Sequence, residues 1–511
     1  MKERIEKAVK EALGTDAPFV VERPRALSHG DYSTNAALVG KADPHELSSK
    51  LRSLLGSNEV ENIEVAGKFI NFYLSREALM PKEQKIAPLY AGKKIMVEYT
   101  DPNPFKEFHI GHLMSNAIGE SIARLLEASG AKVIRANYQG DVGLHVAKAL
   151  WGKMQKPDAL WGEAYTYGAQ EYEGKRTEID EINKKVYEKS DAQINALYDS
   201  GRKESLERFE EIYKTLGTKF YRYFFESETS PKGLALVQKH PEVFEQSEGA
   251  TVFYGTHTRV FITSRGLPTY EAKDLGLMQL KKETESMDES ITITANEQSD
   301  YFSVVLAAAK KIPEIADIAE KTKHISHGMM RFADSKMSSR TGNVITGESL
   351  LEDLTKAARG REDVAVGAIK YTVLKSGSGK DIIFDPEQSL SLEGDSGPYL
   401  QYALVRARSL LRAAEAAGVE MGRSDLPKEA SVLERVLVHY SEVVERAVKE
   451  LEPHYLTTYL TELASAFNSW YASGKVIGGP HQNYGIFLTA AVERTLSKGL
   501  SLLGIPTPEE M

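Results

Sequence analysis

The chain has 511 residues, which is more than one typical hydrophobic core organises, so its length predicts about three or four domains. Hydrophobic residues make up 41% and charged residues 27% of the chain, a composition typical of soluble globular proteins, and no apolar run is long enough to cross a bilayer. The absence of cysteine excludes disulfides and thiolate metal sites and fits a cytoplasmic protein, while the formal net charge of −9 excludes a uniformly basic surface for nucleic acid.

Residues 1–80 predict a small α/β domain. The chain begins with an amphipathic helix that lacks the core of a signal peptide, and a helix at 44–55 and strands at 61–65 and 69–74 follow. The run Gly30-Asp31-Tyr32-Ser33-Thr34-Asn35 and the later Gly-Lys-Phe-Ile-Asn-Phe strand resemble the N-terminal domain of arginyl-tRNA synthetases, which contacts tRNA. The resemblance implies tRNA contacts for Tyr32 and Asn35. The residues alone leave open whether Tyr32 stacks on a base or packs inside its loop.

A strand, a helix and a second strand are predicted for residues 94–137. The apolar run 95–99 ends in a turn-forming Thr-Asp-Pro-Asn-Pro cluster, apolar residues then recur every three or four positions from Ile110 to Leu126, and 132–137 is a strand again. Such a unit belongs to a parallel sheet, whose ligands bind beyond the carboxyl ends of the strands.

Two histidines, His109 and His112, mark the amino-terminal end of this helix. They share one face of the helix, where free N–H groups and the helix dipole favour a phosphate and disfavour a charged ring. Neutral rings donate hydrogen bonds to phosphate oxygens, and Gly111 allows a flat base to lie on the backbone. A surface histidine pair or half of a metal site are the alternatives, but a zinc site needs three or four ligands and no cysteine or third histidine is near.

The sequence His109-Ile110-Gly111-His112 resembles the HIGH signature of class I aminoacyl-tRNA synthetases. Much later in the chain, Lys336-Met337-Ser338-Ser339-Arg340 resembles the KMSKS loop of the same class. The resemblance implies a Rossmann-type catalytic domain at about 90–348 with His109, His112 and Lys336 as catalytic residues. It further implies an ATP site made of His109, Gly111, His112, Lys336, Met337, Ser338 and Ser339.

Between the two signatures, residues 150–230 are charged and helical. The resemblance places an insertion here, between the two halves of the nucleotide-binding fold. No chemistry is predicted for its residues, because charged runs of this kind are usually solvated helix faces. Strands are expected after the insertion, at 251–254, 259–263 and 291–295.

The second half of the fold carries Tyr270 and Asp274, which share one face of a predicted helix, and then Gln298. Here the resemblance is to arginyl-tRNA synthetases, in which a Tyr-x-x-x-Asp pair and a downstream Gln line the amino-acid pocket. A guanidinium is planar, permanently charged and offers five donors, so two carboxylates suit it, and Glu98 with Asp274 would supply them. The residues alone equally allow Asp274 to be an ordinary surface acid. The full set that the resemblance implies for the arginine pocket is Glu98, Asp101, Asn103, His112, Tyr270, Asp274 and Gln298.

The turn after the first strand departs from the family. It reads Thr100-Asp101-Pro102-Asn103, where arginyl-tRNA synthetases often have Ser-Ser-Pro-Asn. Asp101 adds a negative charge that faces either the pocket or the amino group of the substrate. Asn103 is expected to bind the α-carboxylate or the amino group.

Residues 349–390 are expected to link the catalytic domain to an all-helical tail, 391–511. Helical periodicity is clear at 399–411 and 455–471, and a stripe in the second of these segments is expected in the core, formed by Tyr459, Leu463, Ala466, Phe467 and Trp470. The tail resembles the DALR anticodon-binding domain of arginyl enzymes. Exposed cations between the stripes, such as Arg406, Arg408 and Lys475, are therefore the candidates for tRNA contact.

The sequence thus predicts an α/β protein with a parallel-sheet catalytic domain, a small N-terminal α/β domain and a helical C-terminal domain. The resemblance implies an arginine–tRNA ligase that condenses arginine with ATP and Mg²⁺ to arginyl-adenylate and transfers the arginyl group to tRNA. Expected partners are tRNA(Arg), ATP and L-arginine, with no zinc, no protein-bound metal, no membrane and a monomeric state. A synthetase for another amino acid and an inactive tRNA-binding relative are the alternatives. The paired acids argue against the first, and intact His109, His112 and Lys336 argue against the second.

Overall fold

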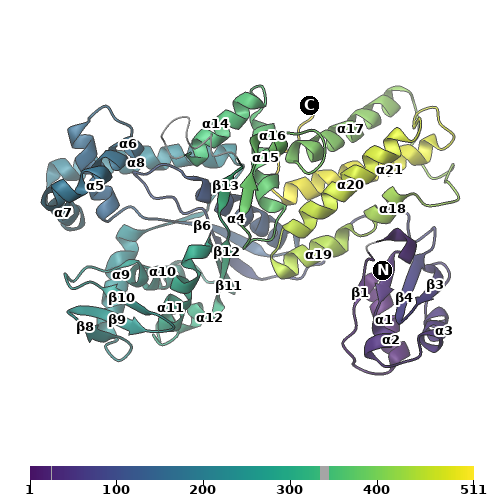
Figure 1. Ribbon diagram of the computed structural model, residues 1–511, viewed down its shortest axis with the longest axis horizontal. Helices are drawn as coiled ribbons and strands as arrows, with labels where there is room; N and C mark the ends of the chain where they lie inside the picture. Colours follow the sequence, from purple (N-terminus) through teal and green to yellow (C-terminus); the bar gives the residue numbers. More distant parts are fainter. Residues whose placement is uncertain (25, 334–344) are drawn as a thin grey trace.

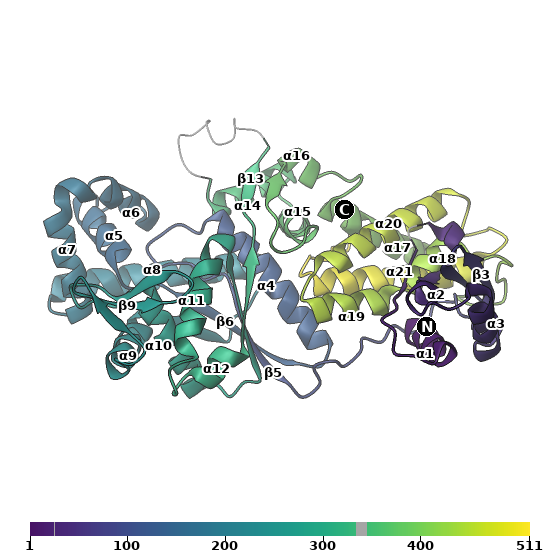
Figure 2. The same ribbon diagram turned by 60° about the horizontal axis from the view of Figure 1, so that its bottom comes forward.

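A computed structural model describes residues 1–24, 26–333 and 345–511 (Figure 1). A parallel sheet lies in the middle part of the molecule, with a group of helices at one end of the long axis and a small α/β unit from the N-terminus at the other (Figure 2). Within these ranges no helix is long and apolar enough to span a membrane. Four residues predicted to bind ATP lie outside the described residues: Lys336, Met337, Ser338 and Ser339.

The parallel sheet has five strands in the order β12-β11-β5-β6-β7. Their bounds are β5 Lys94–Glu98, β6 Lys132–Gln139, β7 Arg222–Phe225, β11 Glu289–Ala295 and β12 Thr322–His327. Ile95 and Val97 of β5 belong to one hydrophobic core, and Met96 belongs to another on the opposite face. Because both faces of the strand are covered, it reads as a continuous apolar run. The predicted parallel sheet is confirmed.

Helix α4 (Ile110–Ala128) connects β5 to β6. Its apolar residues, among them Leu113, Ile118 and Ile122, pack in the same core as Ile95 and Val97. The helix therefore covers one face of the sheet, and its amino-terminal end lies at the carboxyl end of β5, which confirms the predicted strand–helix–strand unit.

Four helices with a core of their own lie between β6 and β7. Their bounds are α5 Leu144–Gln155, α6 Trp161–Gln170, α7 Tyr172–Glu188 and α8 Ala192–Thr215. Val146, Leu150 and Ile179 are buried among them, so this charged stretch is more than a set of solvated faces. Strand β7, which the sequence did not predict, then returns the chain to the sheet.

Between β7 and β11 the chain forms a separate antiparallel sheet. The order of its strands is β10-β9-β8, with bounds β8 Glu245–Ser247, β9 Ala250–Tyr254 and β10 Thr258–Ile262. The helices around it are α9 Glu226–Lys239, α10 Tyr270–Thr284, α11 Ser299–Ala309 and α12 Ala316–Lys321, with a short 3₁₀ turn, η2 Asn296–Gln298, before α11. Two of these three strands were predicted, but their separation from the parallel sheet was not.

The N-terminal unit is a four-stranded antiparallel sheet with three helices. The strands are β1 Val21–Glu22, β2 Tyr32–Thr34, β3 Val60–Ala66 and β4 Phe69–Leu74 in the order β1-β2-β4-β3, and the helices are α1 Lys2–Leu13, α2 Ala36–Val39 and α3 Pro44–Leu54. Gly30, which precedes β2, has a φ of +86°, and a Cβ there would lie 2.5 Å from the carbonyl oxygen of Phe72. Only glycine fits this close approach.

The C-terminal part is helical and shares a core with the parallel sheet. Its elements are α14 Gly347–Ala357, α15 Glu362–Leu374, α16 Pro386–Ser389, α17 Gly397–Ala416, α18 Val432–Leu437, α19 Tyr440–Glu450, α20 His454–Ala472 and α21 Gln482–Leu502, and β13 (Met330–Phe332) pairs with β14 (Ile382–Phe384). Tyr459, Leu463 and Phe467 are buried, and Ala466 and Trp470 pack against the same core, so the stripe expected in the core is there.

Candidate active site

His109 and His112 lie together at the amino-terminal end of α4. Their rings stack with centroids 3.4 Å apart, and the backbone N–H of His109 donates to Nδ1 of His112 at 3.1 Å. Since Nδ1 of His112 accepts, the proton of the neutral ring is on Nε2, which can donate. Burial lowers the pKa of His112 well below its usual value, as do His109, Lys106 and His327. Desolvation and the charges of Lys106 and His327 also lower the pKa of His109. Both rings are therefore neutral at pH 7, as predicted.

The described chain returns to these histidines directly after the KMSSR segment. Thr346 forms an isolated antiparallel bridge with His109, and the N–H of Gly347 donates to the carbonyl of Phe108 at 2.7 Å. The start of α14 is thus attached to the start of α4. The chain that resumes at residue 345 is therefore anchored beside the HIGH sequence.

Three carboxylates, Glu98, Asp101 and Asp274, are neighbours at the carboxyl edge of the sheet, and we call this group the acid pocket. Glu98, the last residue of β5, is only 2% exposed, and its Oε2 lies 2.9 Å from Nζ of Lys281. Asp274, on α10, is half-buried and accepts the hydroxyl of Tyr301 at 2.5 Å. Burial, above all, raises the pKa of Asp274 to about 7, and the charge of Glu98 adds to the rise.

Asp101 lies in a strained turn that the backbone holds in place. Thr100 and Asp101 have φ values of +81° and +50°, a region that costs non-glycine residues on the order of 1–3 kcal/mol each. The N–H of Thr100 donates to Ser115 Oγ at 2.9 Å, Asn116 Nδ2 donates to the Thr100 hydroxyl at 3.0 Å, and the N–H of Tyr138 donates to Asp101 Oδ1 at 2.7 Å. The pKa of Asp101 is well above its usual value because of burial and the neighbouring Glu98. The turn therefore places Asp101 close enough to Glu98 and Asp274 for their charges to raise its pKa.

The remaining predicted pocket residues are more open. Tyr270, in the first turn of α10, is 60% exposed, with Nζ of Lys273 5.1 Å from its ring centroid. Gln298 is exposed at the end of η2. Asn103 accepts the N–H of Gly140 at 3.1 Å through Oδ1. These contacts leave the roles predicted for Tyr270, Asn103 and Gln298 as predictions.

Sequence reasoning missed the basic residues around this site. Lys281 pairs with Glu98, and Lys273 forms a buried ion pair with Glu226 at 2.5 Å. Lys106, just before the HIGH sequence, lies close enough to both histidines to lower their pKa values. The available signal was the spacing along α10: Tyr270, Asp274 and Lys281 fall on one helical face.

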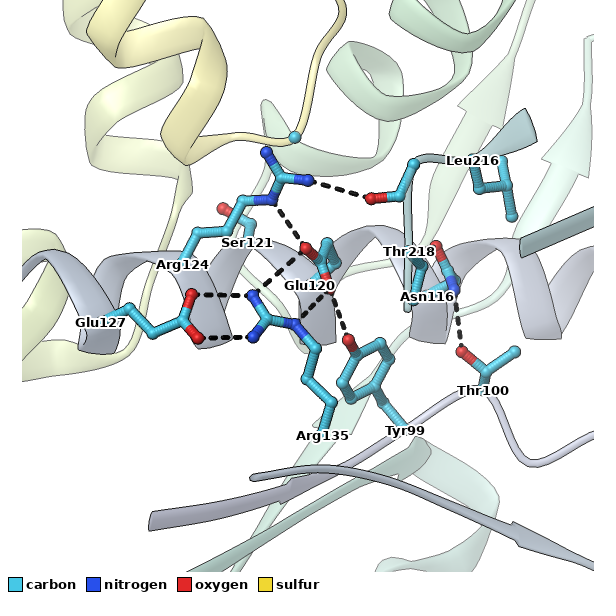
Figure 3. A network of polar contacts seen from close by, with 12 residues as sticks. Tyr99, Thr100, Asn116, Glu120, Ser121, Arg124, Glu127, Arg135, Leu216 and Thr218 are labelled. Atoms are coloured by element: carbon cyan, nitrogen blue, oxygen red, sulfur yellow. Dashed lines mark hydrogen bonds and ion pairs between the residues drawn. The ribbon is translucent and has the colours of Figure 1, made fainter. Parts of the chain in front are cut away.

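A network of ion pairs along α4 fixes the helix behind the site (Figure 3). Glu120, 2% exposed, is contacted by Nε of Arg124 at 2.7 Å, Nε of Arg135 at 2.9 Å and the hydroxyl of Tyr99 at 2.5 Å. Arg135 also forms a two-pronged pair with Glu127, at 2.6 and 2.9 Å. The network joins the helix to β5 and β6, so the position of the HIGH end is set by the sheet.

The same region binds the end of the chain. Arg124 donates to the carbonyls of Gly217, at 3.0 Å, and Ser501, at 2.9 Å. Lys370 is buried and donates to the carbonyls of Leu216 and Gly504 at 2.6 and 2.8 Å. The exit of the helical insertion and the end of α21 are thereby attached to α4 and α15.

The residues predicted to contact tRNA have partners within the protein. Tyr32 is 1% exposed and donates its hydroxyl to Glu442 at 2.5 Å, so the stacking predicted for it is wrong, because a buried ring offers no face to a base. Asn35 is half-buried and accepts the N–H of Val20 at 2.9 Å.

The two arginines proposed for the tail differ from expectation in the same way. Arg408, 15% exposed, pairs with Glu493 at 3.1 Å and also binds the C-terminal segment at Glu509. Its predicted exposure is therefore wrong. Arg406 donates to Asn468 at 2.8 Å and to the hydroxyl of Tyr402 at 2.9 Å. Lys475 is exposed, as expected.

Comparison with known proteins identifies the family. The description "tRNA synthetases class I (R), catalytic domain" matches residues 75–363, "Arginyl tRNA synthetase N terminal domain" matches residues 1–74, and "DALR anticodon binding domain" matches residues 400–511. The arginine–tRNA ligase of Clostridium kluyveri is 28% identical over 98% of both chains, and that of Limosilactobacillus reuteri is 29% identical over 96% of this chain and 95% of the other.

Solved structures give the same result. Arginyl-tRNA synthetase from Thermus thermophilus aligns with a TM-score of 0.81 and 28% identity, covering 100% of this chain and 99% of that one. Since the catalytic-domain match alone spans more than half of the sequence, this chain belongs to the arginyl family of the class I tRNA synthetases, the enzymes that use ATP to ligate arginine to tRNA(Arg).

Proposed function

We propose that the acid pocket binds the cationic groups of arginine and that the amino-terminal end of α4 binds the phosphates of ATP. The observation that carries this proposal is the meeting of Glu98, Asp101 and Asp274 at the carboxyl edge of the sheet. Three acids within one half-buried site are costly unless a cation joins them. Arginine brings two cationic groups, its guanidinium and its α-ammonium.

Asp274 is the acid best suited to the guanidinium. It is half-buried and so reachable, and the Tyr301 hydroxyl already fixes its orientation. Asp101 would then accept from the α-ammonium, and Asn103 would orient the α-carboxylate. Tyr270 and Gln298 would form the walls, and His112 would border both substrates.

In the first reaction step a carboxylate oxygen of arginine attacks the α-phosphorus of ATP. A new P–O bond forms, the bond from the α-phosphorus to its bridging oxygen breaks, and the electron pair leaves with pyrophosphate. His112 Nε2–H and His109 would donate to phosphate oxygens as this charge develops, and Lys336 would neutralise the leaving group. Gly111, Met337, Ser338 and Ser339 would complete the ATP site.

In the second step a hydroxyl of the terminal adenosine of tRNA attacks the arginyl carbonyl carbon. The ester bond forms, AMP leaves with the electron pair of the broken C–O bond, and the proton of the attacking hydroxyl passes to a phosphate oxygen of the leaving AMP. No covalent intermediate with the protein is needed, so catalysis consists of positioning and electrostatic stabilisation.

Mg²⁺ would enter with ATP. In the described part of the chain no group of three or more His, Asp or Glu side chains is arranged to hold a metal ion. Phosphate oxygens supplemented by one or two protein groups are the usual ligands of Mg²⁺ in such sites. Its chemistry there is to neutralise phosphate charge.

We also propose how the parts of the chain divide the work. Residues 1–80 and the helical segment 391–511 would contact tRNA, residues 90–348 would carry out the chemistry, and 349–390 would connect them. Phe69, 44% exposed on the N-terminal unit, replaces Tyr32 as the aromatic candidate for a base. We further propose that the enzyme acts as a monomer in the cytoplasm.

Pyrophosphate exchange with each of the twenty amino acids, with and without total tRNA, tests the proposal. Exchange with arginine alone among the amino acids is the expected result. The family implies that the arginyl enzyme needs tRNA bound before it activates arginine, so exchange should depend on tRNA. Exchange that is supported better by another amino acid would contradict the assignment of the pocket.

A further inference from the structure

A buried ion pair forms part of the acid pocket. Nζ of Lys281 is 2.9 Å from Oε2 of Glu98, and the two side chains are 4% and 3% exposed. Thr292 is paired with Glu98 in the register of β5 and β11 and donates its hydroxyl to Oε1 at 3.3 Å. Oε1 of Glu98 therefore accepts a hydrogen bond, whereas buried Oε2 accepts none and has the ammonium of Lys281 as its ion-pair partner.

Lys281 comes from α10, the helix that also carries Asp274. The two are seven residues apart, nearly two full turns, so they point to the same side of the helix. One face of α10 thus presents both a carboxylate and an ammonium group to the same site. The lysine is the deeper of the two, because Asp274 remains half-buried.

Lys281 reduces the negative charge of this site. Glu98, Asp101 and Asp274 carry three negative charges when ionised, and Lys281 reduces the sum to −2. Arginine brings two cationic groups and one carboxylate, a net charge of +1. Neighbouring carboxylates raise one another's pKa, whereas a nearby cation lowers it. In accord with this rule, Lys281 lowers the pKa of Asp101 and of Asp274, against the stronger effect of burial.

We propose that Lys281 is a positioning residue for arginine: its ammonium fixes the Glu98 carboxylate and keeps Asp101 and Asp274 ready to bind the cationic groups of the substrate. The proposal rests on the proposed arginine pocket and deepens it. Lys281 does not contact the substrate in this role. It acts through Glu98 and through the charge that it contributes.

Other titratable groups face the same site and belong to the balance. They come from β6, α9 and α11, and they are Tyr138, Glu226 and Tyr301. Tyr138 and Tyr301 have pKa values raised well above normal by burial, so they stay neutral. Glu226 is paired with Lys273 at 2.5 Å. The group whose charge changes near neutral pH is therefore Asp274, with its pKa of about 7, while burial and Glu98 raise the pKa of Asp101 well above its usual value.

The test is the KM for arginine in aminoacylation of tRNA(Arg), measured at pH 7 and pH 9 for Lys281→Met and Lys281→Gln. Without the ammonium, Asp274, whose pKa burial already raises to about 7, takes up a proton more readily. The KM at pH 7 should therefore rise on the order of 30-fold, and most of that rise should vanish at pH 9, where this carboxyl group ionises again. The KM for ATP should stay within about twofold in both variants. Lys281→Arg keeps the charge and should restore most of the affinity.

Lys282→Met is the matched control. Lys282 is the next residue of α10, but its side chain is 43% exposed and pairs with Asp317 at 2.6 Å, away from the pocket. The control should leave the KM for arginine unchanged at both pH values.

Three outcomes would overturn the proposal. One is a folded Lys281→Met or Lys281→Gln enzyme with an unchanged KM for arginine at pH 7. Another is an equal rise at pH 7 and pH 9, which would make Lys281 only a structural residue. The third concerns Lys281→Gln, whose amide keeps a hydrogen-bond donor at this position. If this variant does not fold, Lys281 would likewise be assigned to stability alone. Asp274→Asn in the same assay separates the two proposals: if it too leaves KM unchanged, the arginine pocket itself is wrong.

Discussion

At the residue scale, the hydrogen bond from the His109 N–H to Nδ1 of His112 does two things. It closes the first turn of α4, where backbone N–H groups lack partners, and it selects the tautomer that leaves Nε2–H free. A charged ring would bind phosphate more strongly in the ground state, but a neutral donor whose hydrogen bond strengthens as charge develops favours the transition state.

The first prediction concerns this donor. His112→Ala should lower the rate of arginine activation on the order of 100-fold, because one preorganised donor to the developing charge is lost. Affinity for tRNA should be nearly unchanged, since apart from the terminal adenosine the proposed tRNA contacts lie on residues 1–80 and 391–511. The measurement is single-turnover pyrophosphate formation together with a tRNA-binding titration. His45→Ala, at an exposed histidine in the first turn of α3, is the control. A wild-type rate for His112→Ala would exclude the phosphate role, and Lys336→Ala should behave like His112→Ala.

The second prediction tests the guanidinium ligand. Asp274→Asn keeps the shape of the side chain and removes its charge. Breaking a desolvated pair with the guanidinium should cost roughly 3–5 kcal/mol, a factor of about several hundred to several thousand in kcat/KM for arginine. The KM for ATP should hardly change, and the exposed neighbour Asp300→Asn serves as control, since its side chain is 78% exposed. A loss of less than about threefold would remove Asp274 from the pocket.

The third prediction is a pH dependence. Burial raises the pKa of Asp274 to about 7, so its protonated form dominates below that pH and cannot accept from a guanidinium. Bound arginine should lower the pKa of Asp274, because its guanidinium stabilises the ionised carboxylate. The ratio kcat/KM reports the ionisation of the free enzyme, so for arginine it should fall as the pH drops through about 7. The kcat reports the enzyme with arginine bound and should fall only at lower pH. Identical pH profiles for the two quantities would show that this acid does not control arginine binding.

At the element scale, the sequence predicted the elements whose patterns are local. The run before Thr100 predicted β5, the three- and four-residue spacing predicted α4, and the stripe from Tyr459 to Trp470 predicted a buried face of α20, all as found. Strand β7 was missed because Arg222 and Tyr223 resemble the charged helix before them, and only pairing with β6 makes them a strand. Tyr32 and Arg408 were misjudged because their partners, Glu442 and Glu493, are distant in sequence. The pairing of Lys281 with Glu98 is a contact of the same non-local kind.

The fourth prediction concerns the network behind α4. Arg135→Met removes the partner of buried Glu120 and leaves its charge with fewer partners. Breaking a buried pair in this way should lower the free energy of unfolding by about 3–5 kcal/mol. The matched control, Arg446→Met, breaks an exposed pair with Glu450 on α19, whose side chains are 58% and 45% exposed, and should cost no more than about 1 kcal/mol. Chemical denaturation of both variants decides. Equal losses of unfolding free energy in the two variants would mean that the network stabilises the fold no more than an exposed ion pair does.

At the scale of the whole molecule, the N-terminal unit is attached to the helical tail by charged contacts. Arg435 of α18 reaches both oxygens of Asp31, at 2.6 and 2.7 Å, and Arg23 pairs with Glu462 of α20. The Gly-Asp-Tyr segment, which resembles a tRNA-contacting motif, thus faces the tail. The contacts of this segment join the N-terminal unit to the helical tail, so any tRNA contact of the unit uses other surfaces.

The last prediction separates docking from folding. The unit has its own core, which runs from Ile5 to Leu79, so removing residues 1–80 takes that core away whole. Ala430 and Val438 of the tail, which pack against this core, become uncovered, and buried Glu434, which loses Arg76, still accepts the N–H of Ser431 at 2.7 Å. We therefore expect the truncated chain to stay folded and to bind ATP as before.

Its affinity for tRNA(Arg) should fall at least about tenfold, the equivalent of 1.4 kcal/mol, if the unit contacts tRNA. Arg435→Met leaves every residue of the unit in place but removes one of the charges that hold it to the tail. It should therefore weaken tRNA binding less than the deletion does and leave the KM for arginine unchanged. Filter binding measures the tRNA affinity of both variants, and titration with ATP measures their ATP affinity. Equal tRNA affinity in the truncated and full-length chains would show that the unit only packs against the tail, and so would aggregation of the truncated chain, since folding of the tail would then depend on the unit.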